Sequence, residues 1–219
     1  MADFDTAVIV QALPFLWFGM QTSLLLLVLA IIGGVVLGTA IAIARLSGPK
    51  AVAALATGYV NGLRSVPLIM VIFWFYLLVP LLTGRPVGAF TSALVAFTVF
   101  EAAYFSEIIR AGIGGISRGQ AAAAASTGLS RAQAYRHVIL PQAFRRMTPV
   151  LLTQGIALFQ DTSLVYVIGL HDFMTATSVV ANREGRLVEL YLFAAVVYFL
   201  LCFTASRGVQ ALRKGTLAP

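Results

Sequence analysis

The sequence predicts an all-α integral membrane protein with about five transmembrane helices. Of its 219 residues, 60% are hydrophobic and 11% are charged, and the mean hydropathy is +0.93. Both values lie outside the range of ordinary soluble domains. The chain also contains several apolar runs of the roughly 20 residues that a helix needs to cross the bilayer. Its length allows these spans and their loops but no separate soluble domain, so we expect residues 1–219 to form one transmembrane domain.

The apolar runs place the five spans at about residues 15–44, 51–82, 90–109, 147–169 and 190–210. In the first span, Gly33, Gly34 and Gly38 offer small faces against which another helix can pack closely. In the second, Pro67 cannot donate a backbone hydrogen bond, so the helix is expected to kink or break there. The mixed-charge segment 171–189 is expected to lie outside and to be long enough to meet a second partner.

The basic residues predict which side of the membrane each loop occupies. Residues 110–141 carry four arginines and His137 without any Asp or Glu, and Arg145 and Arg146 follow. Cytoplasmic loops collect positive charge, so the loop 110–146 should lie in the cytoplasm. The first 13 residues contain Asp3 and Asp5 but no basic residue, whereas the last span ends in Arg213 and Lys214. We therefore expect a multi-pass protein of the cytoplasmic (inner) membrane with its N-terminus outside and its C-terminus inside.

The loop 110–146 has the pattern of two short helices around a turn. Residues 119–126 are rich in alanine, which favours helix, and Gly128 is suited to the left-handed conformation that ends one. Ser130 is a good N-cap for a second helix over 131–140. This helical pair is either an ordered connection or a docking element for a cytoplasmic partner.

Ionisable side chains within predicted spans need an explanation, because each costs at least about 2.5 kcal/mol at mid-membrane. Glu107 lies near the inner end and is expected to pair with Arg110 or a loop arginine. Arg64, Glu101 and Asp161 lie deeper, and they either pair with one another or line a solute path. The fourth span is also unusually polar around Asp161. The candidate pathway residues are Arg64, Glu101, Gln154, Gln160, Asp161, Thr162 and Ser163.

Several segments resemble a known family. EIIRAGIGGISRGQ, AAAAASTGLS and VILPQAFRRMTP are similar to the cytoplasmic signature loop in membrane subunits of bacterial ATP-binding-cassette (ABC) importers for polar amino acids. LRSVPL and FQDTSLVYVIGL match the same permeases, and FEAAYFSEIIRAGI with LLTQGIALFQDTSLVYV resembles their glutamate/aspartate branch. The resemblance covers about residues 15–205 and implies the MetI-like fold of type I importer permeases.

The resemblance also implies partners and a coupling site. In this family the loop inserts into a cleft of the ATPase subunit and transmits its closure. The implied partners are an ABC ATPase dimer, a second permease subunit (identical or paralogous), an external solute-binding protein and an amino-acid substrate. ATP and magnesium would belong to the ATPase, with no cofactor bound by this chain. One departure is Ala122, where the family usually has an acidic residue. The implied coupling residues are Arg118, Gly119, Gln120, Ala122, Ala123, Ala124, Gly128, Leu129 and Pro141.

Other classes of function find little support in the sequence. It has no G-x-x-x-x-G-K-[ST] phosphate loop, so the chain itself is not expected to be an ATPase. It lacks the residue clusters of catalytic metal sites or Ser/His/Asp triads, so no enzyme is predicted. The net charge of +7 follows membrane topology rather than a nucleic-acid surface. Cys202, alone in an apolar run, is expected to serve packing. The alternatives are a secondary carrier or channel subunit without an ATPase, or an assembly factor.

Overall fold

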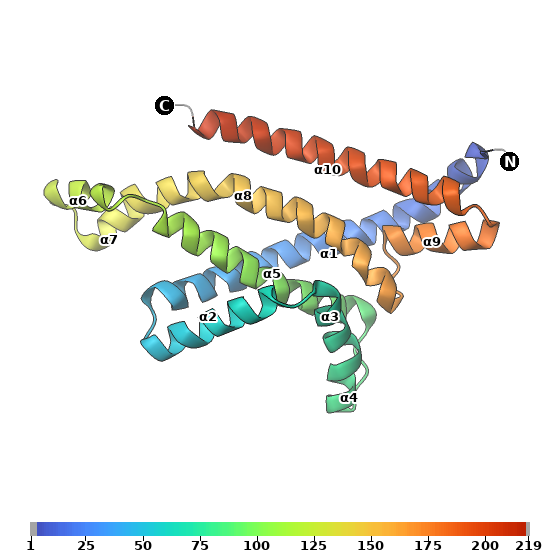
Figure 1. The fold of residues 1–219 in the computed structure, drawn as a ribbon, viewed down its shortest axis with the longest axis horizontal. Coiled ribbons are helices and arrows are strands. Elements are labelled where there is room, and N and C mark those ends of the chain that lie inside the picture. The colour runs from blue at the N-terminus through green and yellow to red at the C-terminus, as the bar shows by residue number, and fades with distance from the viewer. Residues whose placement is uncertain (1–3, 218–219) are drawn as a thin grey trace.

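The computed structural model describes residues 4–217, which form an elongated bundle of helices (Figure 1). The α-helices are α1 (Thr6–Ser47), α2 (Lys50–Arg64), α3 (Leu68–Phe73), α4 (Val79–Thr83), α5 (Ala89–Gly114), α6 (Arg118–Ser126), α7 (Arg131–Ala134), α8 (Leu140–Asp161), α9 (Phe173–Glu184) and α10 (Leu187–Leu217). Two π-helical turns, Trp74–Leu78 and Tyr135–Ile139, and a 3-10 segment, Thr162–Ile168, continue α3, α7 and α8. Within the described residues, four helices can cross a membrane, or five if α2 and its bent continuation count as one. The all-α prediction with about five spans is confirmed.

The membrane helices extend further than the apolar runs indicated. The first helix begins at Thr6 rather than near residue 15, and its 42 residues span about 63 Å. The last helix covers Leu187–Leu217 rather than 190–210. Hydropathy marks only the part of a helix that lies in hydrocarbon, and that part is about 30 Å thick. Two residues used to predict the orientation, Asp3 and the side chain of Lys214, lie outside the part of the chain that the structure describes.

Small residues let α1 and α5 approach each other closely, as the three glycines predicted. A Cβ atom added at Gly38 would lie 2.9 Å from the carbonyl oxygen of Ala102, and one at Gly34 would lie 3.1 Å from the Cβ of Glu101. Larger side chains at these positions would therefore push the helices apart. Around this contact lies the main apolar core, which includes Leu26, Phe97 and Leu158.

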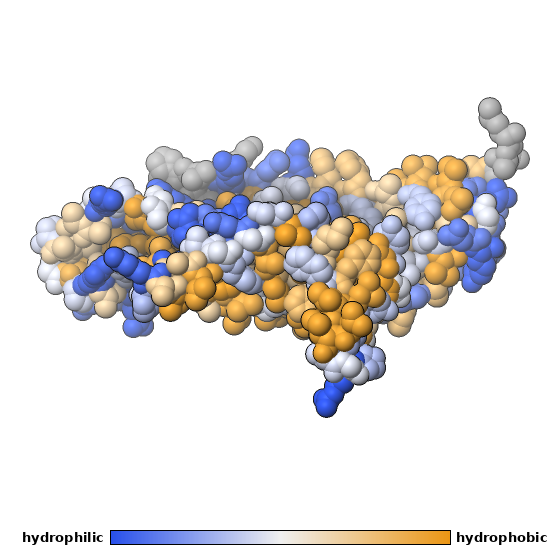
Figure 2. Space-filling view, turned by 60° about the horizontal axis from the view of Figure 1, so that its bottom comes forward, coloured by the Kyte–Doolittle hydropathy of each residue, from blue (hydrophilic) through white to orange (hydrophobic). Residues whose placement is uncertain are grey.

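The second span breaks at Pro67 rather than bending gently. Helix α2 ends at Arg64, and the segment from Leu68 to Thr83 turns away from it by 106°. This segment projects from the bundle as an arm (Figure 1), and its surface is strongly hydrophobic (Figure 2). Leu81 and Leu82 are 79% and 75% exposed, respectively. The sequence predicted the position of the break but not the size of the turn.

The mixed-charge segment 171–189 contains a helix that packs against the bundle. Residues Phe173–Glu184 form α9, which packs against α1 and α10. Asp172 is fully buried and caps this helix by accepting hydrogen bonds from the backbone N–H groups of Met174 and Thr175 at 3.0 and 2.8 Å. Because Gly19 has no side chain, α1 comes so close that an added Cβ would lie 2.5 Å from the Asp172 carbonyl oxygen. The charges of this segment gave no indication that one face of α9 is buried.

The two ends of the bundle carry different helices and turns. Helices α6 and α7, the turn between α1 and α2, and the C-terminal end of α10 lie at one end, whereas the N-terminal end and the α9–α10 turn lie at the other (Figure 1). The first end is the one that carries the basic loop 110–146. The predicted inward elements therefore gather on one side of the molecule.

Candidate functional site

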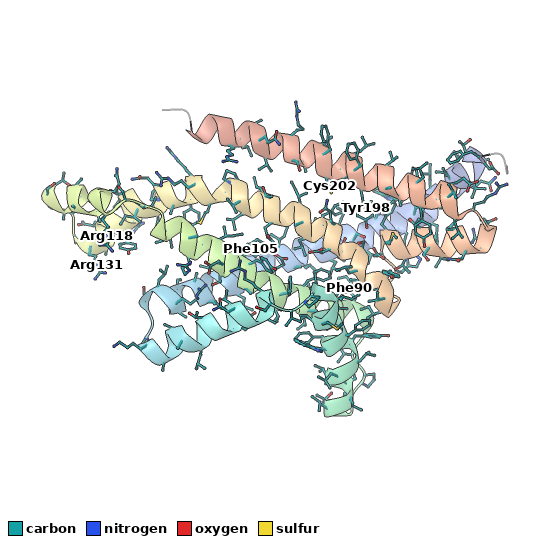
Figure 3. All side chains as sticks on the ribbon, viewed as in Figure 1. Phe90, Phe105, Arg118, Arg131, Tyr198 and Cys202 are labelled. Carbon is teal, nitrogen blue, oxygen red and sulfur yellow. The ribbon has the colours of Figure 1, made fainter. Side chains whose placement is uncertain are left out.

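The signature loop forms a compact protrusion, which we call the coupling knob (residues 118–140). Its two labelled arginines, Arg118 and Arg131, begin its two helical segments at the far end of the bundle (Figure 3). One hydrogen bond ties the knob to α8, and a second joins α8 to the chain just before the knob. Gln142 Nε2 donates to Gln120 Oε1 at 3.1 Å, and Arg146 Nη1 donates to the Gly115 carbonyl oxygen at 2.8 Å. Motion of the knob is thus coupled to the start of α8.

The turn of the knob has the geometry that its sequence predicted. Gly128 has a φ of +81°, the left-handed conformation that L side chains rarely adopt. The Leu129 and Gly128 N–H groups donate to the carbonyl oxygens of Ala124 and Ala125 at 3.2 and 3.0 Å, which closes α6 with a Schellman motif. Ser130 then caps the next helix, in a reciprocal capping box with Gln133. Glycine is therefore required by backbone conformation at the centre of the knob.

Most of the implied coupling residues lie on the knob surface. Arg118, Gly119, Gln120, Ala122, Ala123, Gly128 and Pro141 are exposed, Leu129 is half-buried, and Ala124 is buried. Ala122 thus presents a methyl group to solvent where the family usually has an acid. One expectation was wrong: the second helix does not end at residue 140. It continues from Arg131 through the π-helical turn Tyr135–Ile139 and α8 to Ile168.

The pathway candidates divide into three places, and the central one joins α5 to α8. The Glu101 side chain is completely buried, and both of its oxygens accept from Gln154 Nε2, at 3.2 and 3.1 Å. Asp161, two turns beyond Gln154 on α8, is half-buried and within electrostatic reach of Glu101. We call Glu101 and Gln154 the polar pair. Together with Asp161 they lie between α5 and α8, the two helices that the knob connects.

One of the two alternatives for Arg64, an ion pair with an acid, does not occur. Among residues 4–217, neither Arg64 nor Asp161 forms an ion pair. The guanidinium of Arg64 lies over the ring of Tyr104, 5.3 Å from its centroid, and the residue is exposed. Of the two interpretations, mutual pairing is excluded in this conformation, and a role facing a path or partner remains.

The remaining candidates on the fourth span face elsewhere. Gln160 and Ser163 line a cavity of about 340 Å³ together with Tyr198 of α10. Thr162 is buried and its hydroxyl donates back to the Phe159 carbonyl at 2.7 Å, which serves the helix end. These three polar residues therefore do not join the site formed by Glu101 and Gln154, and Thr162 and Ser163 lie in the 3-10 segment that follows α8.

Glu107 has the structural role predicted for it. Its carboxylate pairs with Arg110 and with Arg45 of α1, the latter at 2.8 Å. This links the inner ends of α1 and α5. Of the two histidines, His137 is exposed on the knob. His171 packs edge-on against Phe15 at 4.6 Å between ring centroids, and its Nδ1 is buried without a hydrogen-bond partner among the described residues.

Sequence reasoning missed two residues. Tyr104 supports Arg64, and its spacing of three from Glu101 on α5 was the available signal. Asp172 was predicted only as one charge of the outer segment 171–189, yet it caps α9 from a buried position. Burial raises its pKa above the ordinary range, against the opposing effect of its hydrogen bonds to Thr175 and Met174. Among residues 4–217, no group of three His, Cys, Asp or Glu side chains is arranged to hold a metal ion.

Comparison with known proteins identifies the family. Residues 34–217 match the family described as the binding-protein-dependent transport system inner membrane component. The chain belongs to this family. As a binding-protein-dependent inner membrane component, it is a multi-pass transport subunit of the inner membrane, which confirms the resemblance of its signature loop.

Relatives of this inner membrane component match it along nearly its whole length. The glutamate/aspartate import permease protein GltK of Escherichia coli O6:H1 is 49% identical over 99% of this chain and 100% of its own. The probable glutamine ABC transporter permease protein GlnM of Bacillus subtilis is 36% identical over 90% of both chains. No part of the chain requires a separate explanation.

Solved structures agree with this assignment to the family of inner membrane components. The crystal structure of an amino acid ABC transporter with histidines has a TM-score of 0.91 and 31% identity, covering 98% of this chain and 99% of that one. An inward-facing structure of the MetNI methionine ABC transporter, at 18% identity and a TM-score of 0.67, shares the fold. The MetI-like fold expected from the sequence is therefore confirmed.

Proposed function

We propose that this chain is the permease subunit of an ATP-driven importer for glutamate and aspartate. The observation that carries the proposal is the 49% identity with a glutamate/aspartate import permease over essentially the whole of both chains. The exposed coupling knob supports the ATP-driven part, because it offers a rigid helical surface at the predicted cytoplasmic end. ATP and magnesium are held by a separate ATPase dimer in this proposal.

The polar residues at membrane depth support an amino-acid path. The buried carboxylate of Glu101 has only the amide of Gln154 as a donor, and such a group is costly in hydrocarbon. Ionisable groups within membrane spans usually serve transport or pair with one another. The amide of Gln154 and the carboxylates of Glu101 and Asp161 suit the ammonium end of an amino acid. Arg64 suits the opposite end, because a guanidinium can hold a carboxylate through two parallel hydrogen bonds. We assign these four residues to the solute path.

A second permease subunit would complete the path. Helix α2 exposes Arg64 and Asn61 at membrane depth beside Gly58 and Gly62, and Cβ atoms added to these glycines would meet no atom within 4 Å. Charged and amide groups are costly against lipid, and a small-xxx-small face permits close helix packing. This face of α2 and the projecting arm are therefore our proposed contact with a second permease, identical or paralogous.

Coupling would proceed through continuous helix. Closure of the ATPase dimer moves the knob inward, and the helix from Arg131 to Ile168 carries that displacement to Gln154 and Asp161. The contact between Gln154 and Glu101 then shifts relative to α5 and opens the path to one side. The basic end faces the cytoplasm in this proposal, with the N-terminus outside, where a solute-binding protein delivers the substrate.

The test is uptake by the complete complex in proteoliposomes, with the ATPase, the second permease and the binding protein present. ATP-dependent uptake of labelled glutamate is expected, and excess unlabelled aspartate should compete while arginine should not. Arg64→Gln should lower uptake strongly at normal expression, whereas Arg183→Gln, an exposed arginine near the other end, should not. Uptake that persists without ATP while an ion gradient is maintained would refute the proposal in favour of a secondary carrier.

A further inference from the structure

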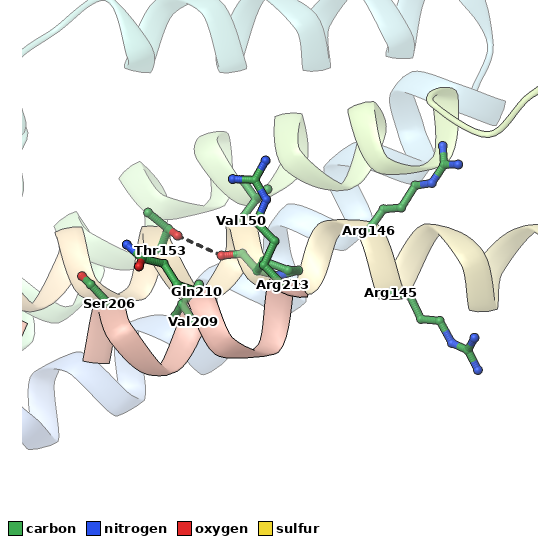
Figure 4. A pocket seen from close by; sticks show the side chains of 9 residues that line it. Arg145, Arg146, Val150, Thr153, Ser206, Val209, Gln210 and Arg213 are labelled. Carbon is green, nitrogen blue, oxygen red and sulfur yellow. Dashed lines mark hydrogen bonds between the residues drawn. The ribbon is translucent and has the colours of Figure 1, made fainter. Parts of the chain in front are cut away.

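Arg64 is held in a different way from the arginines at the basic end of the bundle. There, around a cleft of about 660 Å³ between α8 and α10, the side chains of Arg145 and Arg213 point in different directions (Figure 4). Arg146 of the same cleft donates to a backbone carbonyl oxygen. Arg64 instead ends α2, and its guanidinium lies over the ring of Tyr104, 5.3 Å from the centroid. This arrangement at membrane depth needs an explanation of its own.

The ring under Arg64 is itself held in place. Tyr104 is half-buried on α5, and its ring packs against Phe100, one turn earlier on the same helix, at 5.2 Å between centroids. Phe100 is only 6% exposed and belongs to the main apolar core. Helix α2 is fixed on α5 in turn, because the hydroxyl of Tyr59 donates to the Val99 carbonyl oxygen at 2.5 Å. These contacts between α2 and α5 define where the guanidinium lies.

An aromatic ring holds a guanidinium without neutralising its charge. The face of the ring attracts a cation electrostatically, and arginine stacks readily on such faces. A carboxylate partner would instead occupy the N–H groups and cancel the charge. Within residues 4–217, Arg64 forms no ion pair and donates no hydrogen bond. Its N–H donors are therefore available to a ligand.

A free guanidinium at this depth matches a carboxylate. The Arg64 side chain is exposed, so a ligand can reach it, and donors without an acceptor are costly away from water. A carboxylate accepts two parallel hydrogen bonds from one guanidinium, and every amino acid carries a carboxylate. Neither Glu101 nor Asp161 forms an ion pair with Arg64. A substrate carboxylate would thus bind without first breaking an internal pair.

We propose that Tyr104 is a positioning residue for substrate recognition. Its ring holds the Arg64 guanidinium as a cation that no acid of this chain neutralises, and Arg64 binds a carboxylate of the amino acid as it passes α5. This inference rests on the proposed function, in which Arg64 belongs to the solute path. It adds the side chain that keeps Arg64 both fixed and free to bind. Tyr104 does not touch the substrate, and only the face of its ring is needed.

The experiment is a double-mutant cycle on glutamate binding. The complex of both permease subunits and the ATPase is purified without the binding protein, so that the dissociation constant of labelled glutamate reports on the membrane subunits. Tyr104→Leu should raise this constant about fivefold, which corresponds to the roughly 1 kcal/mol of a cation–π contact. Tyr104→Phe keeps the ring and should bind glutamate like the wild type. In the Arg64→Gln background, Tyr104→Leu should cause no further loss, because Tyr104 acts through Arg64.

Helix α10 offers a matched control. Arg207 lies over the ring of Phe203, 5.8 Å from its centroid, and this ring packs against Phe199 at 5.4 Å. These contacts repeat those around Arg64, but they lie within one helix toward the basic end of the bundle. Phe203→Leu and Arg207→Gln should therefore leave the glutamate dissociation constant unchanged. Losses equal to those of the Tyr104 and Arg64 variants would overturn the proposal in favour of a general effect on the fold.

The cycle itself can also refute the proposal. If the losses from Tyr104→Leu and Arg64→Gln add up in the double variant, Tyr104 acts independently of Arg64 and serves packing alone. If Tyr104→Phe binds as weakly as Tyr104→Leu, the hydroxyl and not the ring face is required. If Arg64→Gln binds glutamate normally but separates the two permease subunits, Arg64 belongs to their interface.

Failure of this inference can be distinguished from failure of the proposed function. ATP-dependent glutamate uptake by the wild-type complex, together with an additive cycle, would refute the role of Tyr104 and leave the transport function intact. If the complex imports a different amino acid, the glutamate assignment fails, and the same cycle is measured with the imported amino acid, which also carries a carboxylate.

Discussion

Replacing Gly128 with valine should uncouple ATP hydrolysis from transport. Gly128 has a φ of +81°, and a Cβ atom there would meet no atom within 4 Å, so the cost comes from the backbone and not from a clash. An L residue in this conformation costs roughly 1–2 kcal/mol, and a β-branched one is a genuine outlier. That energy lowers the population of the native turn by about 5- to 30-fold relative to alternatives. The apparent affinity for the ATPase should fall by up to the same factor, the full loss being reached where the native turn becomes the minor state.

The assay combines two measurements on the reconstituted complex. The first is the dissociation constant between the permease in nanodiscs and its ATPase, and the second is the ratio of solute imported to ATP hydrolysed. Gly128→Asn should lie between the wild type and Gly128→Val, because asparagine tolerates the left-handed region better than most residues. Gly119→Ala is the matched control: it lies on the same knob in ordinary helical geometry, where its Cβ would be 3.8 Å from the Ser117 hydroxyl.

The ordering of these variants is the decisive result. Backbone strain requires that valine be worse than asparagine and that Gly119→Ala be close to wild type. If Gly128→Val binds the ATPase normally and imports as much solute per ATP, the left-handed turn has no part in coupling. If Gly119→Ala fails as badly as Gly128→Val, the surface of the knob matters and its turn geometry does not.

Three further predictions concern packing, the polar pair and the cap of α9. Gly38→Leu should destabilise the protein by about 1–3 kcal/mol in thermal unfolding, because α1 and α5 must separate, whereas Gly58→Ala should not. Gln154→Leu leaves the Glu101 carboxylate without its donor and should cost about 1–3 kcal/mol or more; adding Glu101→Gln should restore much of the loss, and no restoration would argue against the pairing. Asp172→Ala should cost about 1 kcal/mol and Asp172→Asn less, which proteolysis of the α9 region would report.

Local backbone chemistry was the most predictable part of this protein. Gly128 and Ser130 lie in a turn whose conformation is decided within a few residues, so the sequence placed both correctly. Pro67 broke its helix for an equally local reason, the missing N–H. The glycines of α1 indicated close packing because small residues have no other evident use in the middle of a membrane helix.

Contacts between helices were less predictable. Arg64 and Asp161 carry opposite charges at similar depth, but their pairing depends on the direction of α2 after its break, which no single helix encodes. Gln160 and Gln154 lie on one helix but face different neighbours, because six residues of α-helix rotate one side chain well away from the other. The burial of Asp172 could not be predicted for the same reason. It depends on the helix that packs over this N-cap, here α1 at Gly19.

The unbroken course of the chain from Arg131 to Ile168 has a mechanical consequence. These 38 residues make a continuous helix of about 57 Å, so in the proposed mechanism the surface that contacts the ATPase and the polar groups of the solute path belong to one mechanical element. A tilt of only a few degrees about its contact with α5 would move either tip by more than an ångström. The π-helical turn at Tyr135–Ile139 is then a flexible point close to the knob. Its stiffness would determine how much of the knob's displacement reaches the membrane part of the helix.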